Sequence, residues 1–521
     1  MMSQLSAIDR AYDVVVVGYG AAGAVAAIEA ARAGASVLLI EKMPDPGGIS
    51  ILSAGGIRVG FDADSVFSYL KHTCGGRTPD DVLRVLADGM VEIPAYVREL
   101  AQLNGARVGV RQALGNYPFP GHDALGYVEV EAIPGFKEAG NSPEDGYLAA
   151  RPLRPGCFLF RLLSDNVDHY VRTGAVTLEF CTRAVRLLRD TEGAINGLEI
   201  VRDGSQAEQV RVLRGVVLAT GGFEANEEMK LQYLVSTPVV TGSFRGNTGD
   251  GIRMAQAVGA DLWHMWHYHG PYGMRHPDPD YPFGLYVKLL PMWTPGHTGQ
   301  ALPRMAWIIV DQFARRYVDE YPPYLSDTGV RQFDYYDPQS ASHSRLPSFL
   351  IFDERGRTMY PMGRSITNDR SAHYEWSSDN LKEVANGILL AAPTLVDLAR
   401  QLDLPPDILA ATVERWNLDC ARGHDSDFGR RPETMVPIVK PPFYAARLWP
   451  IVINTQGGPV HDARQRILDT DRQPIPRLYA AGEMGSVFGH VYLAGGNLAE
   501  CVVGGRIAGR EAAILSPLTE S

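Results

Sequence analysis

The chain is poor in cysteine, and its cysteines do not cluster. The five cysteines (Cys74, Cys157, Cys181, Cys420 and Cys501) lie far apart, and no two of them form a C-x-x-C pair. An odd number of widely spaced cysteines argues against a disulfide framework and against a zinc or iron–sulfur site. We therefore expect no bound metal and a cytoplasmic location.

Excess positive charge and long apolar runs are also missing. The formal net charge is −11, so the composition gives no reason to expect nucleic acid or an anionic membrane as a partner. No apolar run reaches the roughly 20 residues that cross a bilayer. The N-terminus lacks the basic region, apolar core and cleavage site of a secretory signal. We expect no membrane anchor, and the 521 residues predict two domains.

What the sequence has in abundance is glycine placed after predicted strands. Residues 13–17 are apolar and β-branched, as in a strand buried on both faces of a parallel sheet. A G-Y-G-A-A-G turn at 18–23 follows, then an alanine-rich helix and a second strand at 36–40 that leads into Glu41. This order of elements is typical of a dinucleotide-binding βαβ unit, in which the acid binds a ribose diol and the helix N-terminus binds a pyrophosphate.

Further glycine-rich segments favour FAD over a nicotinamide dinucleotide. They lie at 47–56, 219–223, 246–251 and 482–496. Glycine lets backbone approach a ligand closely, and an extended cofactor needs such contacts at several separated places. The last segment leads into a predicted helix that begins near Asn497, whose N-terminus would offer free N–H groups and partial positive charge to a flavin.

These segments resemble the flavoprotein family that contains soluble fumarate reductases, the succinate dehydrogenase flavoprotein subunit and 3-ketosteroid dehydrogenases. The matching motifs are VGYGAAG at 17–23, ATGGF at 219–223, NTGDG at 247–251, TQGGP at 455–459 and LYAAGE at 478–483. The resemblance implies an α/β fold: a Rossmann-like FAD-binding domain, split in sequence, with an inserted α+β cap (catalytic) domain.

The same resemblance implies domain limits and cofactor contacts. We expect the two parts of the FAD-binding domain at 1–265 and 439–521, with the cap at 266–438 and the substrate between cap and flavin. Because Ile49 stands where membrane-bound relatives carry the histidine that links to FAD, we expect noncovalent FAD. The implied contacts are Gly18, Gly20, Ala22, Gly23, Glu41, Lys42, Gly48, Ser53, Gly55, Gly56, Ala219, Thr220, Gly221, Asn247, Asp250, Gly482, Glu483 (to the ribityl chain), Gly496, Asn497 and Leu498.

Fumarate reductases of this family hold a dicarboxylate with cationic side chains, which this chain lacks at the matching positions. The proton-donating arginine of their cap falls on Tyr324, and a histidine and an arginine near their C-terminus fall on Phe488 and Tyr492. A dicarboxylate bound there would lose its hydration without gaining a counterion, which is costly. The sequence therefore argues against a fumarate reductase.

At these positions the chain is similar to 3-ketosteroid dehydrogenases. Glu320 and Tyr324 match their cap motif, and residues 489–496 match G-H-x-Y-x-x-x-G. The resemblance implies 1,2-desaturation of a cyclic ketone, steroidal or smaller. Tyr492 O–H and Gly496 N–H would bind the carbonyl oxygen, Tyr324 would take the α-proton, and flavin N5 would accept a hydride from the β-carbon. Tyr117 resembles a further active-site tyrosine.

Some alternatives stay open. A tyrosine base needs activation, because its reference pKa is near 10, and Arg315, Arg316, Tyr117 or Tyr321 could provide it. We interpret the histidine-rich run 263–269 as aromatic lining of the cleft between cap and flavin rather than as a metal site. The alternative functions are a flavin-dependent reductase of an enone or enoate other than fumarate, and a flavin-binding protein without turnover. The electron acceptor and the oligomeric state are unknown.

Overall fold

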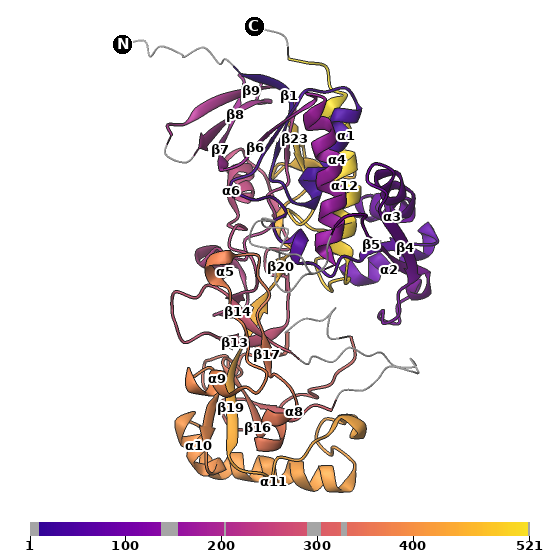
Figure 1. Cartoon of the computed structure of the whole chain (residues 1–521). Helices are drawn as coiled ribbons and strands as arrows, with labels where there is room; N and C mark the ends of the chain where they lie inside the picture. Colours follow the sequence, from indigo (N-terminus) through magenta and orange to yellow (C-terminus); the bar gives the residue numbers. More distant parts are fainter. Residues whose placement is uncertain (1–9, 137–154, 203–204, 289–303, 325–330, 519–521) are drawn as a thin grey trace.

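The computed structural model describes residues 10–136, 155–202, 205–288, 304–324 and 331–518. The chain forms two parts, one above the other in Figure 1. The upper part contains both the early and the last elements of the sequence, and the middle of the sequence forms the lower part. The predicted α/β architecture, with a first domain split in sequence and a cap inserted into it, is confirmed, and we keep the predicted name FAD-binding domain for the split part.

The FAD-binding domain is built on an eight-stranded sheet with the main strand order β22-β23-β9-β1-β2-β6. The pairs β1–β2, β1–β9, β2–β6 and β9–β23 are parallel. Val14 and Val16 of β1 face the core under α1, and Val15 and Val17 face the core on the other side of the sheet. Burial on both faces explains why this strand is apolar throughout. The strands are β1 Ala11–Val17, β2 Val37–Ile40, β6 Val176–Glu179, β7 Thr182–Arg189, β8 Ile195–Arg202, β9 Glu208–Leu218, β22 Arg466–Leu468 and β23 Pro474–Ala480.

One face of this sheet is covered by helices that come from opposite ends of the sequence. They are α1 (Ala21–Arg32), α4 (Gly156–Arg172) and α12 (Gly496–Ala513), which stand side by side in Figure 1. Gly509 of α12 lies so close to α1 that a Cβ there would come within 2.4 Å of the Ala26 carbonyl oxygen. The alanines of α1 and the glycines of α12 therefore permit unusually close packing, which fixes the C-terminal segment against the dinucleotide turn.

A three-stranded sheet and two helices extend this domain on one side (Figure 1). The sheet has the order β3-β5-β4, and the two helices beside it are α2 and α3. Two further helices, α5 and α6, belong to the same domain. The bounds are β3 Ile57–Gly60, β4 Arg107–Gln112, β5 Leu125–Ala132, α2 Ala63–Cys74, α3 Asp80–Ala101, α5 Glu227–Tyr233 and α6 Asp250–Ala257. Within the described ranges no helix combines the length and the apolar character that a membrane span requires.

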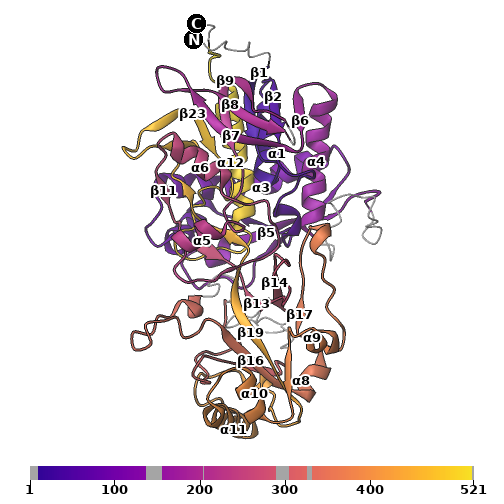
Figure 2. The ribbon, with the colours of Figure 1, turned by 90° about the vertical axis from the view of Figure 1, so that its left-hand side faces the viewer.

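The cap is a second mixed sheet with the main order β15-β16-β19-β13-β14-β17. Ile308 and Val310 of β15 face a core under α10 and α11, whereas Trp307 and Ile309 face a core on the opposite side. Figure 2 shows these two helices at the end of the cap farthest from the FAD-binding domain. The elements are β10 Val240–Thr241, β13 Tyr272–Arg275, β14 Gly284–Val287, β15 Trp307–Val310, β16 Ser348–Asp353, β17 Gly363–Arg364, β18 Leu390–Ala392, β19 Phe443–Val452, α8 Glu354–Met359, α9 Leu381–Ala385, α10 Leu395–Gln401 and α11 Pro406–Arg422.

The strand that follows the predicted cap limit is part of the cap sheet. β19 begins at Phe443, after the expected boundary at 438, and pairs with β16 and β13. Two short pairs, β11 (Leu262–Trp263) with β21 (Gly458–Pro459) and β12 (Tyr268–His269) with β20 (Asn454–Thr455), follow where the chain passes between the two parts. The domain limits stay predictions, and the pairing of β19 favours a cap that ends near residue 452.

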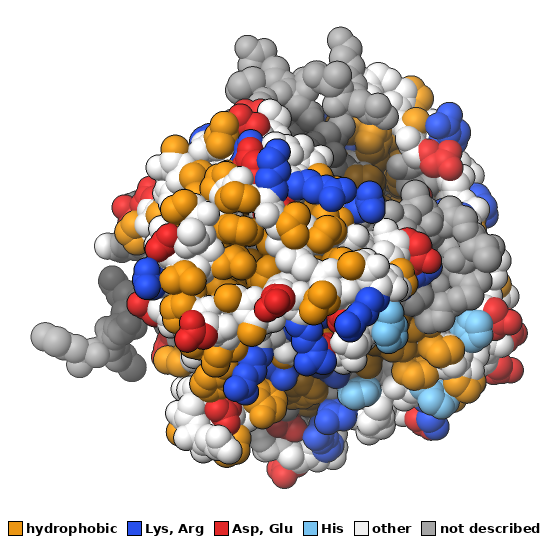
Figure 3. Space-filling view, turned by 90° about the horizontal axis from the view of Figure 1, so that it is seen from below, with side chains coloured by type: hydrophobic (Ala, Val, Ile, Leu, Met, Phe, Trp, Pro, Cys, Tyr) orange, Lys and Arg blue, Asp and Glu red, His pale blue; other side chains and the backbone are white. Residues whose placement is uncertain are grey.

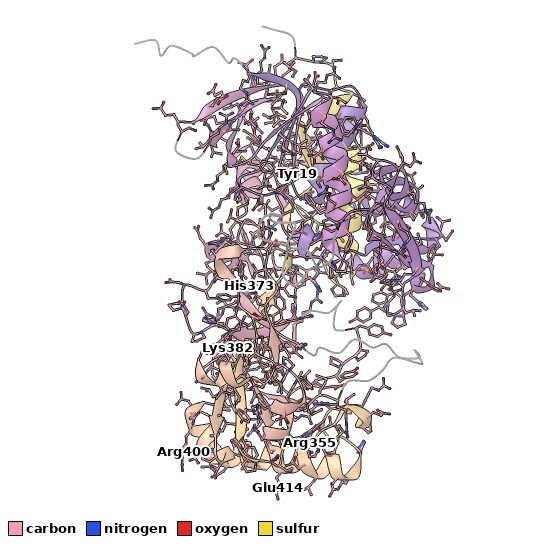
Figure 4. The ribbon with its side chains drawn as sticks, viewed as in Figure 1. Tyr19, Arg355, His373, Lys382, Arg400 and Glu414 are labelled. Carbon is pink, nitrogen blue, oxygen red and sulfur yellow. The ribbon has the colours of Figure 1, made fainter. Side chains whose placement is uncertain are left out.

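The outer end of the cap is an ordinary solvated surface. Figure 4 shows Tyr19 within the FAD-binding domain and Arg355, Arg400 and Glu414 at the opposite end of the molecule, on α8, α10 and α11. Viewed from that end, apolar side chains are interspersed with charges of both signs (Figure 3). This mixture is typical of a surface in water and offers no field of one sign.

A buried ionic network holds the cap together beneath this surface. Arg316 lies 2.7 Å from Glu320 and 2.9 Å from Asp425, and Arg430 lies 3.4 Å from Glu320. Both guanidinium groups also lie over the Trp416 ring, at 4.6 and 4.9 Å from its centroid. All of these side chains are buried, so each charge depends on its partners.

Replacing Arg316 by Met is expected to lower the free energy of unfolding by about 3–5 kcal/mol, because it leaves Glu320 and Asp425 buried without their cation. Chemical denaturation followed by circular dichroism measures the change. Arg315→Met is the matched control, since the Arg315 side chain is exposed. A loss below about 1 kcal/mol, the worth of a surface ion pair, would contradict this interpretation.

Candidate active site

A single cavity of about 570 Å³ runs from the dinucleotide turn to the cap. Both parts of the chain contribute, because its walls come from the first turn of α1, the first turn of α12, the loop after β9 and the inner strands of the cap. It brings together most of the residues predicted to hold a cofactor: Gly18, Gly20, Ala22, Glu41, Lys42, Gly48, Ser53, Gly56, Ala219, Thr220, Gly221, Asn247, Asp250, Glu483, Asn497 and Leu498.

Four of the predicted glycines support the walls from behind instead of lining the cavity. A Cβ at Gly23 would come within 1.8 Å of the Gly18 carbonyl oxygen, and one at Gly55 within 2.6 Å of the Pro155 backbone. One at Gly482 would lie 2.8 Å from the Cβ of Ala22, and one at Gly496 would lie 2.5 Å from the Phe488 ring. None of these four positions therefore has room for a Cβ atom.

Gly496 also differs from expectation in its backbone. Its N–H donates to the Leu493 carbonyl oxygen at 2.6 Å. The amide predicted to bind a substrate carbonyl is therefore engaged within its own loop, which the spacing of the motif could not reveal. A substrate would have to displace the Leu493 carbonyl to reach it.

The nucleotide end of the cavity contains matched charges. Glu41 is buried and accepts hydrogen bonds from the N–H groups of Tyr19 and Met43, at 2.8 and 2.9 Å. Burial raises the pKa of Glu41, and these donors oppose that shift. Lys42 donates to Asp250 at 2.9 Å, which links the end of β2 to the start of α6.

Two of the tyrosines predicted to be catalytic lie at the end of the cavity next to the cap. Tyr324 of the cap and Tyr492 of the C-terminal glycine segment both line it. Tyr117 lies behind Tyr324 and stacks on it, with ring centroids 4.4 Å apart. Segments far apart in sequence thus place three tyrosines around one end of the cavity.

Of the groups considered for activating Tyr324, Tyr117 is the one in ring contact with it. Arg316 is held by Glu320 and Asp425, and Tyr321 is buried in the cap core. Burial raises the pKa of Tyr324 above its usual value of 10, so the phenol is neutral in this structure.

Sequence reasoning missed polar side chains at this end, apart from His269, which belongs to the run 263–269 predicted to line the cleft. His269 lines the cavity beside Tyr492, with ring centroids 4.0 Å apart, and its buried Nδ1 has no hydrogen-bond partner. Burial lowers its pKa to about 3, so the ring is neutral. Tyr286 and Ser243 also line the cavity and are hydrogen-bonded to each other. Only the histidine-rich run gave any signal in the sequence.

The rest of that run does not line the cavity, which corrects our interpretation of it as a wall of the cleft. His264 and His267 are hydrogen-bonded to the carbonyl oxygens of Ser486 and Phe488 and support the C-terminal glycine segment from outside. Among the residues that the structure describes, no group of three His, Cys, Asp or Glu side chains could hold a metal ion.

Comparison with known proteins identifies the family. The FAD binding domain family matches residues 13–498, which is nearly the whole chain. The chain belongs to this family of FAD-binding flavoproteins. It is an FAD-dependent oxidoreductase that acts on CH–CH groups.

Individual relatives of this flavoprotein include dehydrogenases and reductases. It is 28% identical over 573 residues to 3-oxosteroid 1-dehydrogenase of Mycolicibacterium smegmatis, covering 92% of this chain and 93% of that protein. It is 26% identical over 520 residues to NADH:fumarate oxidoreductase of Klebsiella pneumoniae, covering 97% of this chain but only 48% of that protein. The solved 3-ketosteroid Δ1-dehydrogenase of Sterolibacterium denitrificans, in complex with 1,4-androstadiene-3,17-dione, superposes with a TM-score of 0.76 at 25% identity, covering 97% of this chain and 99% of that one.

The cavity of the flavoprotein fits FAD. The first turns of α1 and α12 open onto it, so two helix N-termini face the space for the pyrophosphate and for the flavin carbonyls. Glu41 would bind the adenosine ribose. Glu483, which accepts from Asn454 and the Thr455 N–H at 3.2 and 3.0 Å, would bind the ribityl chain.

A second buried carboxyl group controls the charge of Glu483. Glu224 lies beside it, and both side chains are almost fully buried. Burial raises the pKa of Glu483, and the adjacent Glu224 raises it further. Two carboxyl groups this close and this buried resist carrying two negative charges.

Glu500 holds the loop that precedes α12. It accepts from the Val487 N–H at 2.7 Å, from Asn497 at 2.8 Å and from the Ser486 hydroxyl. Burial raises its pKa to about 7. The network fixes Asn497, which lines the cavity at the flavin end.

This buried carboxyl predicts how stability depends on pH. Between about pH 5 and 7 the unfolded chain has lost the Glu500 proton while the folded protein keeps it, so the free energy of unfolding falls as pH rises. The expected loss is about 3 kcal/mol, complete slightly above pH 7. Urea unfolding of the FAD-saturated protein at a series of pH values measures it.

Glu500→Gln should flatten that decline, whereas Glu192→Gln, at an exposed position, should leave it unchanged. An undiminished decline in the Glu500 variant would assign the pH dependence to another group.

Proposed function

We propose that this flavoprotein desaturates a cyclic ketone, forming a C=C bond between the α- and β-carbons next to the carbonyl group (1,2-desaturation). The observation that carries the proposal is the presence of Tyr324 and Tyr492, from the cap and from the C-terminal segment, in one cavity with the residues that would hold FAD. The relative named 3-oxosteroid 1-dehydrogenase supports it. A steroid or a smaller oxocyclohexane would be the substrate.

The carbonyl oxygen would accept a hydrogen bond from the Tyr492 hydroxyl. This donor favours the enolate-like form of the ketone, and a donor of this kind contributes about 2.7–4 kcal/mol to the transition state. His269, held neutral beside Tyr492, can orient that tyrosine. The Gly496 N–H would be the second donor once it exchanges the Leu493 carbonyl for the substrate oxygen.

Tyr324 would take the α-proton on its phenolic oxygen. Because burial raises the pKa of Tyr324, ionisation must be assisted when the substrate binds. Tyr117 stacks on Tyr324, which makes it the partner that the geometry favours. Bound FAD would supply the acceptor for the hydride that leaves the β-carbon, and the electron pair of the broken α-C–H bond forms the new C=C bond.

The FAD would be held noncovalently. Ile49 lines the cavity and offers no atom for a covalent bond to FAD. The glycine contacts and the two helix N-termini leave cofactor binding to hydrogen bonds and dipoles.

Reduction of an enone or enoate other than fumarate is the second candidate. The relative named NADH:fumarate oxidoreductase favours this direction. Phe488 and Tyr492 stand in place of the cations that would bind a dicarboxylate. Fumarate itself would therefore not be the substrate.

Tyr324→Phe tests the proposed base. The variant should retain FAD, because Tyr324 is not among the residues predicted to hold the cofactor, but its kcat for ketone desaturation should fall about 10²- to 10⁴-fold. The assay follows reduction of an artificial electron acceptor and identifies the enone product. Tyr335→Phe, an exposed cap tyrosine, is the control. Full activity in the Tyr324 variant would refute its role as base.

A further inference from the structure

Two arginines lie against one tryptophan outside the cavity. The guanidinium carbons of Arg77 and Arg331 are 5.7 and 5.2 Å from the ring centroid of Trp266. Arg77 lies between α2 and α3 of the FAD-binding domain, and Arg331 begins the short 3-10 turn Arg331–Asp334 in the cap. The group therefore spans the two parts of the chain.

Neither arginine has an anionic partner within the described ranges. No ion pair is formed by Arg77 or Arg331 there, and the Nη2 atom of Arg331 is buried without a hydrogen-bond partner. Asp334 is the acid that interacts electrostatically with Arg331, and its carboxylate already accepts a hydrogen bond from the Ser236 hydroxyl. Burial lowers the pKa of Arg331, and the charge of Arg77 lowers it further. Arg77 is exposed, so water solvates its charge, whereas the buried donor of Arg331 is costly to leave unsatisfied unless an anion completes the group.

The group lies beside the catalytic end of the cavity. Arg331 is close enough to Tyr117 for their charges to interact, and Tyr117 stacks on Tyr324. On the other side, a Cβ at Gly489 would lie 3.0 Å from the Cβ of Arg77, which places Arg77 against the segment that carries Tyr492. The arginines are thus next to both catalytic tyrosines without lining the cavity between them.

A neighbouring histidine adds no third charge. Burial lowers the pKa of His490, and the charges of Arg331 and Arg77 lower it further. The positive charge of this group therefore resides on the two guanidinium groups, whose fork of N–H donors matches the geometry of a carboxylate.

We propose that Arg331 and Arg77 form a subsite for a carboxylate carried by the ketone substrate, at the end of the molecule away from its reacting carbonyl. The inference rests on the proposed function and specifies its substrate class. Tyr492 stands where the fumarate reductases carry a cation, so the charge of the substrate would be recognised by the arginine pair beside the cavity and not at the reacting carbonyl. The carboxylate would satisfy the orphaned Nη2 of Arg331.

The test compares two ketones on the FAD-loaded enzyme. One is a cyclohexanone with a carboxylate on the ring carbon opposite the carbonyl, and the other is its methyl ester. The wild-type kcat/KM should be about 10- to 100-fold higher for the acid, the range expected for charge-assisted hydrogen bonds. Arg331→Met should raise the KM of the acid by the same factor and should leave the KM of the ester within twofold of the wild-type value. Arg331→Lys should restore part of the preference, and Arg355→Met, at the far end of the cap, should change nothing.

Two kinetic outcomes would overturn the subsite. Equal activity with acid and ester in the wild type would show that the arginines do not recognise the substrate's charge. An equal loss of kcat for both ketones in Arg331→Met would show that the arginine acts on the Tyr117–Tyr324 pair instead. Both results leave the desaturase proposal intact.

A binding measurement separates the subsite from the reaction. Cyclohexanecarboxylate, which has no ketone, should perturb the absorption of the oxidised flavin, and its Kd should rise about 10- to 100-fold in Arg331→Met. An unchanged Kd, or equal competition by chloride at the same concentration, would overturn the subsite. If no ketone is oxidised, the proposed function fails, and this titration still decides whether the arginines bind a carboxylate.

Discussion

The packing of α12 on α1 is the contact on which the site depends. Ala26 of α1 and Gly509 of α12 leave no room for a side chain between the helices. Because the helices are so close, both of their N-termini open onto one cavity. The same contact carries the loop with Tyr492 to the end of a space that begins at Gly18. One helix pair thus positions the nucleotide end and the catalytic end together.

The second constraint is the polarity of the catalytic end. The sequence predicts Tyr324, Phe488 and Tyr492 at the positions where a dicarboxylate site would need cations, and the chain compensates buried charge elsewhere. Arg316 pairs with Glu320 and Asp425 inside the cap, and burial next to Glu224 raises the pKa of Glu483, which disfavours a second negative charge there. Within the described ranges, the buried Nη2 atom of Arg331 has no partner and stands outside this pattern, which is why we assign Arg331 and the adjacent Arg77 to a ligand.

The elements predicted best are those encoded locally. The glycine turn at 18–23, α1 and the start of α12 follow from strand and helix patterns in single segments, and the structure places them as expected. Tyr286 and Ser243 were missed because their place in the cavity depends on contacts between remote segments, and of the run 263–269 only His269 lines the cavity as predicted. For the same reason the sequence could not show that Arg316 pairs with Asp425 instead of Tyr324, or that the Gly496 N–H bonds Leu493.

The direction of the reaction is the central claim, and the half-reaction tests it most directly. A cyclic ketone is mixed with the oxidised, FAD-loaded protein in the absence of oxygen, and the flavin absorption band is followed. We predict that the band bleaches and that one enone forms for each flavin reduced. A band that survives every cyclic ketone, together with reoxidation of pre-reduced protein by an enone or enoate, would contradict the account.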